Sequence, residues 1–341
     1  MTRPTTRPAP TPTTGGGSPP AGGASAAGGG KRFTLANVRR GLTPGPDRIL
    51  LYGIEGVGKS SFAADAEAPI FLAAEDGVRN LSPVPDCVPE IRAWGDVLDA
   101  LEMLRAEDHD YKTVVVDTLD WLDGLLRDEV CRRNGWSVED FGDYGRGLKV
   151  TPDEWRRVLN ALKRLEDERG MAAIVIAHAR TKNFRNPAGA DYLRWEPNLA
   201  GDLGPALWKA WAHSVLFATY EAGVSVENRG KEPESLKRGK GWSTGARILH
   251  SSWNAAWDAK NRYDLPETLP LSWEEYVRAR EARRPADPAV LLAEAEGLLQ
   301  KVDPETAAAA RPLIEKHRDN AANLARVVDR LRAKAANTEV R

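Results

Sequence analysis

One short segment has the residue types and the spacing of a phosphate-binding loop. Residues 53–60 read Gly-Ile-Glu-Gly-Val-Gly-Lys-Ser and match the pattern G-x-x-x-x-G-K-[ST]. The glycines let backbone N–H groups turn around a phosphate, the lysine reaches the β- and γ-phosphates of ATP, and the serine hydroxyl binds Mg²⁺. An apolar strand at 48–52 precedes the segment, and a helix follows it whose N-terminus adds partial positive charge. The residues predicted to hold ATP are Gly53, Glu55, Gly56, Val57, Gly58, Lys59, Ser60 and Ser61.

A carboxylate at the end of a second apolar strand completes the predicted metal site. The valines at 114–116 lead directly to Asp117. A buried strand that ends in aspartate delivers its carboxylate beside the phosphate loop, where it holds Mg²⁺ together with Ser60. Asp120 is the alternative carboxylate, but it falls one turn into the following helix. We therefore predict a Mg²⁺ site formed by Ser60 and Asp117.

Two acidic residues, Glu75 and Asp76, follow a third apolar strand at 69–73. A carboxylate in this place can accept a proton from, or orient, the water that attacks the γ-phosphate. A solvated Glu-Asp turn is the alternative interpretation of the same residues. We take Glu75 as the candidate catalytic carboxylate.

Short apolar strands alternate with helical segments through most of the chain. Such alternation is typical of βαβ units, so the sequence predicts a mostly parallel sheet flanked by helices. After residue 219, two β segments flank a Gly- and Lys-rich loop and predict antiparallel strands at one edge. The predicted strands are 49–52, 69–73, 113–117, 172–177, 214–219, 222–228 and 246–252. The predicted helices are 59–67, 96–107, 118–133, 153–169, 268–284, 287–301, 304–316 and 319–335.

Composition divides the chain into three parts. Residues 1–30 hold eight of the 30 glycines and six of the 23 prolines, without acidic or aromatic residues, and predict a disordered tail. Residues 31–284 form the predicted α/β domain. Residues 285–341 repeat apolar residues at helical spacing and predict a small C-terminal helical appendage.

Charge, hydropathy and cysteine content exclude several classes of protein. The 48 Lys+Arg and 49 Asp+Glu give a net charge of -1, which excludes a uniformly basic nucleic-acid coat and an acidic disordered chain. No apolar run approaches the roughly 18 residues of a membrane span, and the N-terminus lacks the apolar segment of a secretory signal. Cys87 and Cys131 fit no zinc site or disulfide framework, so we expect two small buried apolar residues in a reducing cytoplasm.

These motifs, in this order, resemble the RecA-like P-loop ATPase core, and more closely the phage ATP-binding proteins of the single-strand annealing type. The resemblance covers about residues 48–266. It implies that Glu75, which follows the strand at 69–73, activates water and that Asp117 is the aspartate expected at the end of the next core strand, 113–117. It also implies a γ-phosphate sensor at the end of the next strand, where this chain has His178. RecA itself has glutamine at that position, whereas the phage proteins commonly carry histidine.

A basic pair late in the core, Lys260 and Arg262, resembles the Lys-x-Lys or Lys-x-Arg finger of RecA-like filaments and hexameric helicases. A cation inserted from a neighbouring subunit neutralises charge that develops on the transferred phosphoryl group. The resemblance implies that both residues act on the ATP of an adjacent subunit, and that the protein forms a ring or a filament. A basic surface loop is the alternative interpretation.

Two loops face nucleic acid in the RecA-like core, and the corresponding segments here are 140–147 and 180–204. Basic residues with interleaved aromatic residues suit single strands, because cations track the phosphates and rings stack on bases at ~1–3 kcal/mol per base. A third basic loop surrounds residue 238. The residues predicted to bind DNA are Tyr144, Arg146, Arg180, Lys182, Arg185, Arg194, Trp195, Lys237, Arg238 and Lys240.

The local charge supports such a binding face. Residues 180–262 contain 13 Lys+Arg and eight Asp+Glu, a local excess of +5 in a chain of net charge -1. Seven of the 11 tryptophans lie between residues 195 and 273. Trp195 and Trp242 have polar surroundings and are predicted to stack on bases. The tryptophans predicted to pack the sheet edge instead are Trp208, Trp211, Trp253 and Trp257.

The residues and the resemblance together predict an ATPase, using ATP and Mg²⁺, that is stimulated by single-stranded DNA. The implied role is annealing or pairing of strands in phage recombination, in the host cytoplasm if the chain is phage-encoded and without a membrane. A single-strand DNA-binding protein is a further candidate partner. The alternatives are a helicase or packaging motor with the same core, an ATP-gated regulatory or scaffold module without DNA contact, and a small-molecule kinase.

Overall fold

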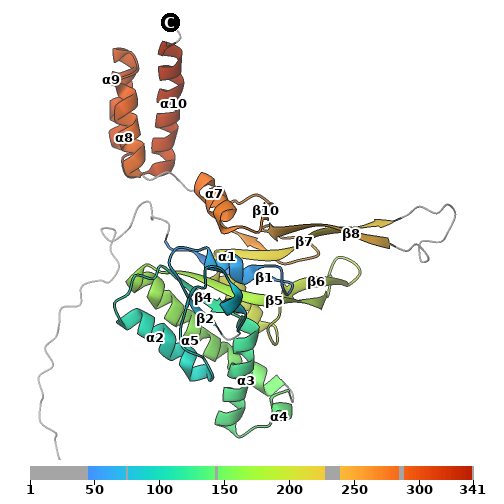
Figure 1. Ribbon diagram of the computed structural model, residues 1–341. Helices are drawn as coiled ribbons and strands as arrows, with labels where there is room; N and C mark the ends of the chain where they lie inside the picture. Colours follow the sequence, from blue (N-terminus) through green and yellow to red (C-terminus); the bar gives the residue numbers. More distant parts are fainter. Residues whose placement is uncertain (1–44, 74–75, 143–144, 227–238, 284–287, 340–341) are drawn as a thin grey trace, which may run out of the picture. The chain divides into compact units, whose positions relative to one another are not determined.

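A mostly parallel sheet forms the centre of the computed structural model, which describes residues 45–73, 76–142, 145–226, 239–283 and 288–339 (Figure 1). The middle strands lie in the order β2, β4, β5, β1 and β7, and they are all parallel. Their bounds are β2 Pro69–Ala73, β4 Thr113–Asp117, β5 Ala172–Phe184, β1 Arg48–Gly53 and β7 Ser214–Val226. A two-residue strand, β3 (Asp86–Cys87), extends the sheet beyond β2.

Antiparallel strands lie on the other side, as the sequence predicts. Strand β8 (Gly239–His250) pairs with β7, and β10 (Thr268–Pro270) pairs with β8. Strand β9 (Lys260–Asn261) also pairs with β7, while β6 (Tyr192–Pro197) folds back on the far half of β5. The mixed α/β fold with antiparallel strands at one edge is therefore confirmed.

The central strands are apolar on both faces because helices cover both faces of the sheet. Leu50 and Tyr52 of β1 point into one core, and Ile49 and Leu51 into the other. The first core is covered by α2 (Trp94–Ala106), α3 (Leu119–Asn134), α5 (Arg146–Arg169) and α6 (Leu203–Trp211). The second is covered by α1 (Lys59–Ala64) and α7 (Trp273–Arg283), and Phe62 packs edge-on against Trp273 at 5.4 Å there.

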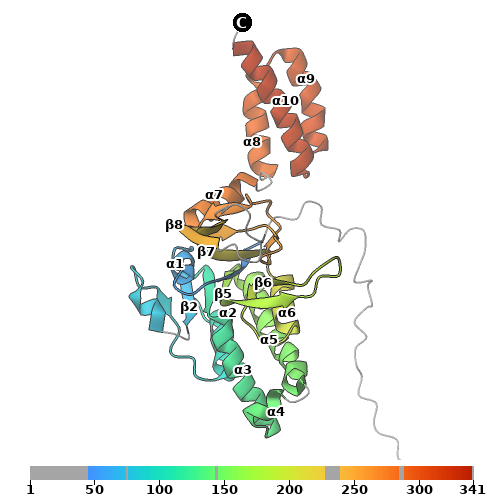
Figure 2. The same cartoon turned by 90° about the vertical axis from the view of Figure 1, so that its right-hand side faces the viewer.

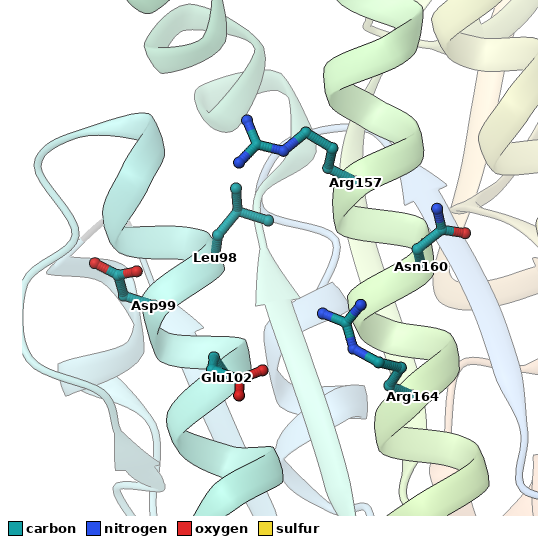
Figure 3. Close-up of a pocket in the computed structure, with 6 residues that line it drawn as sticks. All are labelled: Leu98, Asp99, Glu102, Arg157, Asn160 and Arg164. Atoms are coloured by element: carbon teal, nitrogen blue, oxygen red, sulfur yellow. The ribbon is translucent and has the colours of Figure 1, made fainter. Parts of the chain in front are cut away.

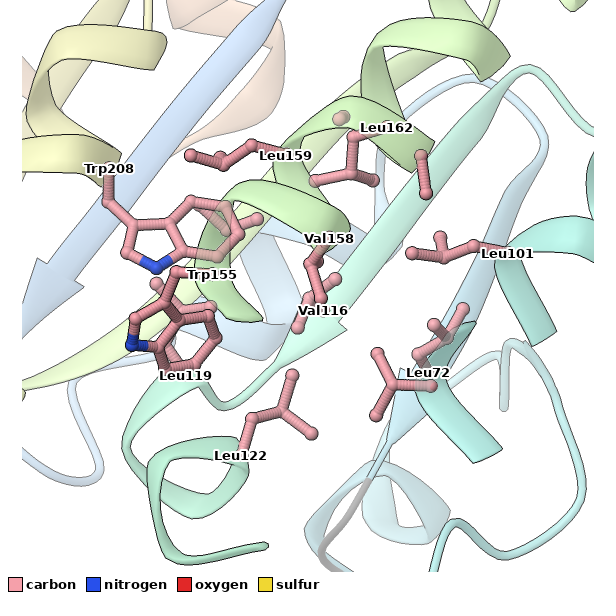
Figure 4. Packing of buried hydrophobic residues seen from close by; sticks show 14 of the residues in the cluster. Leu72, Leu101, Val116, Leu119, Leu122, Trp155, Val158, Leu159, Leu162 and Trp208 are labelled. Atoms are coloured by element: carbon pink, nitrogen blue, oxygen red, sulfur yellow. The ribbon is translucent and has the colours of Figure 1, made fainter. Parts of the chain in front are cut away.

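Tryptophan side chains fill the first core between α5 and its neighbours (Figure 4). The Trp155 ring lies edge-on to Trp94 at 5.2 Å and to Trp208 at 5.4 Å. All three are fully buried. Edge-to-face aromatic contacts add specific geometry to the apolar burial, so they fix α5 against α2 and α6.

The predicted loop at 140–147 is wrong as to structure. Its described residues belong to α4 (Val138–Gly142), which lies beyond the end of α3 in Figure 2, and to the first turn of α5. Phe141 is buried, and a Cβ atom on Gly147 would lie 2.2 Å from its ring. The glycine therefore admits an aromatic ring of the core rather than a DNA backbone.

Other predicted boundaries also differ from those of the structure. Strand β5 runs seven residues past its predicted end at 177 and returns as β6, so much of the predicted loop at 180–204 is a strand pair. Helix α5 begins at Arg146 rather than at 153. The predicted helix at 268–284 is in fact strand β10 followed by α7. Cys131 is buried as expected, but Cys87 is exposed.

Three further helices share an apolar core of their own: α8 (Pro288–Leu299), α9 (Pro304–Lys316) and α10 (Ala321–Glu339). Leu291, Ile314 and Leu324 are among its buried residues. Asp303 caps α9, because its Oδ1 accepts a hydrogen bond from the backbone N–H of Thr306 at 2.9 Å. The predicted domain boundary at 285 stays a prediction. Within the described residues, no helix is long and apolar enough to cross a membrane.

Candidate nucleotide-binding site

The strand register brings the predicted motifs to one edge of the sheet. Gly53, at the end of β1, lies opposite His178 of β5. On the other side of β5, Asp117 of β4 lies opposite Ile176, and Ala73 of β2 lies opposite Asp117. Ligands of open α/β sheets bind beyond the carboxyl ends of the strands, which is where these residues meet.

The phosphate loop has the backbone that its glycines predict. Gly58 has φ 106°, a left-handed conformation that favours glycine, and it precedes the first residue of α1. A Cβ atom on Gly53 would lie 2.1 Å from the carbonyl oxygen of Ala218, so this glycine allows β1 to approach β7. The Lys59 side chain is buried, and its Nζ donates to the carbonyl oxygens of Gly53 at 3.0 Å and Ile54 at 2.8 Å. The lysine therefore lies across the loop.

The serine and the aspartate that were predicted to share a metal ion are in direct contact. Ser60 Oγ donates to Asp117 Oδ2 at 2.6 Å, although the residues are 57 positions apart. The Asp117 side chain is largely buried at the end of β4. A hydroxyl and a carboxylate oxygen are hard donors of the kind that Mg²⁺ prefers, so these residues fit the metal that the loop implies.

Asp120, the alternative carboxylate for the metal, is hydrogen-bonded to His178. Its Oδ1 accepts from the backbone N–H of His178 at 2.9 Å, and its Oδ2 lies 2.6 Å from Nδ1 of the same histidine. Burial opposes ionisation, but the hydrogen bonds from His178 prevail and hold the pKa of Asp120 below its ordinary value. Asp120 therefore holds the predicted sensor. The only signal of this pairing in the sequence is the placement of Asp120 in the first turn of α3.

The remaining acid of the predicted site, Glu75, lies outside the described residues. Its strand, β2, ends at Ala73 beside Asp117. The catalytic role of Glu75 stays a prediction.

Lys260 makes contacts within its own chain that the sequence did not reveal. Its Nζ donates to the carbonyl oxygens of Lys209 at 2.8 Å, Ala210 at 3.0 Å and Ala212 at 2.7 Å. These carbonyls belong to the C-terminal end of α6, where a cation is favoured by the helix dipole. Burial, with a smaller effect of Arg262, lowers the pKa of Lys260. Arg262 itself is exposed, and the action of either residue on a neighbouring subunit stays a prediction.

Two cations of the predicted DNA face, both on the β5–β6 strand pair, form ion pairs with acidic residues. Lys182 forms an ion pair with Asp202, which lowers the pKa of that carboxyl group, and a longer one of 3.9 Å with Glu196. Arg194 is buried, pairs with Glu196 at 2.5 Å and lies over the Phe184 ring at 4.3 Å. The excess charge predicted for this segment is therefore partly compensated.

Burial changes the other predicted DNA contacts as well. Arg180 is half-buried. Burial of Asp123 raises the pKa of that carboxyl group, and the positive charge of Arg180 partly offsets this effect. Trp195 is half-buried and packs against Phe217, with ring centroids 6.1 Å apart. The prediction that Trp195 presents its ring to DNA bases is not supported by this packing. Arg146 and Arg185 are exposed.

The structure confirms the predicted packing of three tryptophans and contradicts that of a fourth. Trp208 is buried, Trp211 is half-buried, and Trp257 stacks on His250 at 3.9 Å, so these three pack as expected. Trp242 is 50% exposed, and the expected packing of Trp253 is wrong because it is 60% exposed. Tyr144, Lys237 and Arg238, together with the side chain of Lys240, lie outside the described residues.

A separate groove of about 330 Å³ lies between α2 and α5 (Figure 3). Its lining residues are Leu98, Asp99, Glu102, Arg157, Asn160 and Arg164. None of the residues predicted from the sequence to bind or act on a ligand lines this groove. The phosphate loop is a better candidate site because its geometry matches its motif.

The strand order and the loop geometry are those of a P-loop ATPase with a RecA-like core, in which β5, the strand of His178, lies between the loop strand β1 and the Asp117 strand β4. A family model described as an AAA domain matches residues 46–263, and the chain belongs to this AAA domain family. A search of curated proteins gave no match. The crystal structure of the RadB recombinase is similar, with 16% sequence identity and a TM-score of 0.33, over 57% of this chain and 87% of that one.

Proposed function

We propose that this protein hydrolyses ATP with Mg²⁺, binds single-stranded DNA, and promotes annealing or pairing of strands in phage-type recombination. One observation carries the ATPase part: the 2.6 Å hydrogen bond from Ser60 Oγ to Asp117 Oδ2 joins two motifs that were predicted separately. Two oxygen donors held together at the C-terminal edge of a parallel sheet, beside a buried lysine, are suited to a metal–triphosphate.

Each residue of the site has a role that follows from its position. Lys59 binds the phosphates, exchanging the carbonyl oxygens it now contacts for phosphate oxygens of higher charge. Ser60 and Asp117 hold the metal, which neutralises charge on the β- and γ-phosphates when bound. Glu75 positions the attacking water, and the His178 ring hydrogen-bonds the γ-phosphate while Asp120 fixes the orientation of that ring.

The proposed DNA face is smaller than the sequence indicated. It keeps the exposed Arg146 and Arg185 and the basic segment at 237–240, and Trp242 is the stacking residue. Arg194 and Trp195 support the strand pair from within instead. The same proposal includes self-assembly, with Arg262 acting on the ATP of an adjacent subunit.

A second candidate is an ATP-gated regulatory or scaffold module that does not contact DNA. The ion pairs of Lys182 and Arg194 favour it, because they neutralise cations in the segment where the RecA-like core would meet nucleic acid. The motor and kinase alternatives share the same ATP site, and no geometry among the described residues favours either.

Binding of labelled oligo-dT, followed by fluorescence anisotropy with ATP, with ADP and without nucleotide, separates these candidates. The proposal predicts ATP-dependent binding that weakens steeply with salt, since cation–phosphate contacts release counterions. Arg185→Ala should weaken binding, whereas Arg156→Ala, an exposed arginine on α5, should not. Absence of binding at low salt in every nucleotide state would contradict the DNA part and leave the regulatory module. ATP-driven unwinding of a duplex would instead indicate a motor.

A further inference from the structure

The β7–β8 hairpin contacts the phosphate loop through a tyrosine. The Tyr220 hydroxyl donates to the carbonyl oxygen of Gly56 at 3.4 Å. Tyr220 lies directly opposite Arg247 in the antiparallel register of the two strands. Neither residue belongs to a nucleotide-binding motif, so the sequence alone does not connect them with ATP.

The Arg247 guanidinium lies against the loop backbone itself. A Cβ atom built on Gly58 would lie 2.7 Å from Nη1 of Arg247 and 3.7 Å from a methyl group of Leu271. The backbone N–H of Leu271 donates to the carbonyl oxygen of Arg247 at 2.9 Å and secures β8 at this place. The missing side chain at Gly58 therefore leaves room for a second cation next to Lys59.

Arg247 differs in its partners from three arginines of the same domain. Arg48, Arg194 and Arg280 are each ion-paired with a carboxylate. Arg247 is exposed, and no described carboxylate forms an ion pair with it. A guanidinium presents a planar set of donors that matches two phosphate oxygens. An exposed guanidinium beside an anion-binding loop is well placed to bind a nucleotide phosphate.

We propose that Arg247 binds the phosphates of the nucleotide from within the same chain, and thereby links nucleotide binding to the β7–β8 hairpin. This inference rests on the proposed binding of ATP to the loop. Arg247 lies on β8, and this strand begins at Gly239, within the basic segment 237–240 that is predicted to bind DNA. Nucleotide that holds Arg247 in place also restrains the strand that leads to this segment.

Hydrogen exchange of the full chain, with and without Mg²⁺–ATP, tests the link. Two segments are compared, the phosphate loop at 53–62 and the hairpin strand at 241–250. In the wild type, ATP should slow exchange in both segments. In Arg247→Ala, the loop should still be protected at saturating ATP, but the hairpin should not. A fluorescent ATP analogue should bind this variant roughly 10- to 100-fold more weakly, as expected for loss of a charged hydrogen bond.

Two variants make the outcome specific. Arg247→Lys keeps the charge but loses the planar set of donors, so it should recover part of the affinity and of the hairpin protection. Arg156→Ala removes an exposed arginine on α5 and should behave as the wild type. Wild-type affinity and hairpin protection in Arg247→Ala would overturn the inference and leave the ATP site intact. Lack of ATP protection in both segments of the wild type would contradict the proposed function as well.

Discussion

Replacing Asp120 by asparagine tests whether the contact to His178 contributes to hydrolysis. In the structure the carboxylate accepts from the His178 backbone N–H at 2.9 Å and lies 2.6 Å from the ring nitrogen Nδ1. Asparagine has the same shape and keeps one oxygen for the backbone N–H, but it removes the negative charge beside the ring. The change is therefore electrostatic, with little effect on packing.

The size of the effect follows from the kind of hydrogen bond that is lost. Hydrogen bonds to charged groups contribute about 1.5–3 kcal/mol and neutral ones about 0.5–1.5 kcal/mol. The difference of about 1–1.5 kcal/mol corresponds to a roughly 5- to 12-fold decrease in kcat. Because the pKa of Asp120 lies below its ordinary value, the group stays ionised at neutral pH.

Steady-state ATP hydrolysis, measured together with ATP affinity, gives the result. The affinity of Asp120→Asn for ATP should stay close to that of the wild type, since the loop residues are unchanged. Asp128→Asn is the matched control, because Asp128 is exposed on the same helix. A wild-type kcat for Asp120→Asn, or an equal loss in the control, would refute the assignment of His178 as a sensor held by Asp120.

Four further predictions concern other parts of the domain. Lys59→Ala should abolish detectable hydrolysis and weaken ATP binding, and unchanged turnover would argue against the loop as the ATP site. Glu75→Gln should still bind ATP but hydrolyse it at least 100-fold more slowly, in line with roughly 10²–10⁴-fold for general-base catalysis, as single-turnover assays can show. Lys260→Ala should lower the free energy of unfolding in urea by about 1–2 kcal/mol, because the lysine no longer binds the last carbonyl oxygens of α6. Arg262→Ala should slow hydrolysis without this loss of stability, and mixed oligomers with active subunits should recover the rate. Full activity of a verified Arg262→Ala monomer would contradict the action of Arg262 on a neighbouring subunit. Burial and the neighbouring Arg48 lower the pKa of His213 to about 4 in the folded protein. As the pH falls from 6.5 to 4, the histidine is protonated in the unfolded chain before it is protonated in the folded one, so the free energy of unfolding should decrease. Solvent exposure limits this loss to about 1–2 kcal/mol, and His213→Gln should remove it.

The parallel strands could be predicted because each is recognisable from its own apolar residues. Strands β2 and β4 have the predicted bounds, since each is a short apolar run between polar turns. The phosphate loop was equally predictable, because its spacing and flanking elements are contained in one stretch of sequence. The register that places Asp117 beside Ser60 follows from the fold class once the strands are known.

The parts that escaped prediction depend on neighbours distant in sequence. At residues 180–184 of β5, half-buried and exposed side chains alternate, and most of them are polar. Such residues are typical of a loop, and only the pairing with β6 shows that they form a strand. Lys182 and Arg194 looked like DNA contacts because the sequence does not show that the fold pairs Lys182 with Asp202, 20 residues away, or that it buries Arg194 near Asp258. Arg247 has no motif, and only the β7–β8 register and the missing side chain of Gly58 connect it with the loop.

The rate of ATP hydrolysis by the full chain should be measured as a function of Mg²⁺ and of oligo-dT, with the size of the assembly determined in the same samples. We expect an oligomer whose hydrolysis of ATP depends on Mg²⁺, is stimulated by single-stranded DNA and is abolished by Lys59→Ala. Absence of ATP hydrolysis with Mg²⁺ present, or a rate that Lys59→Ala leaves unchanged, would contradict the proposed function.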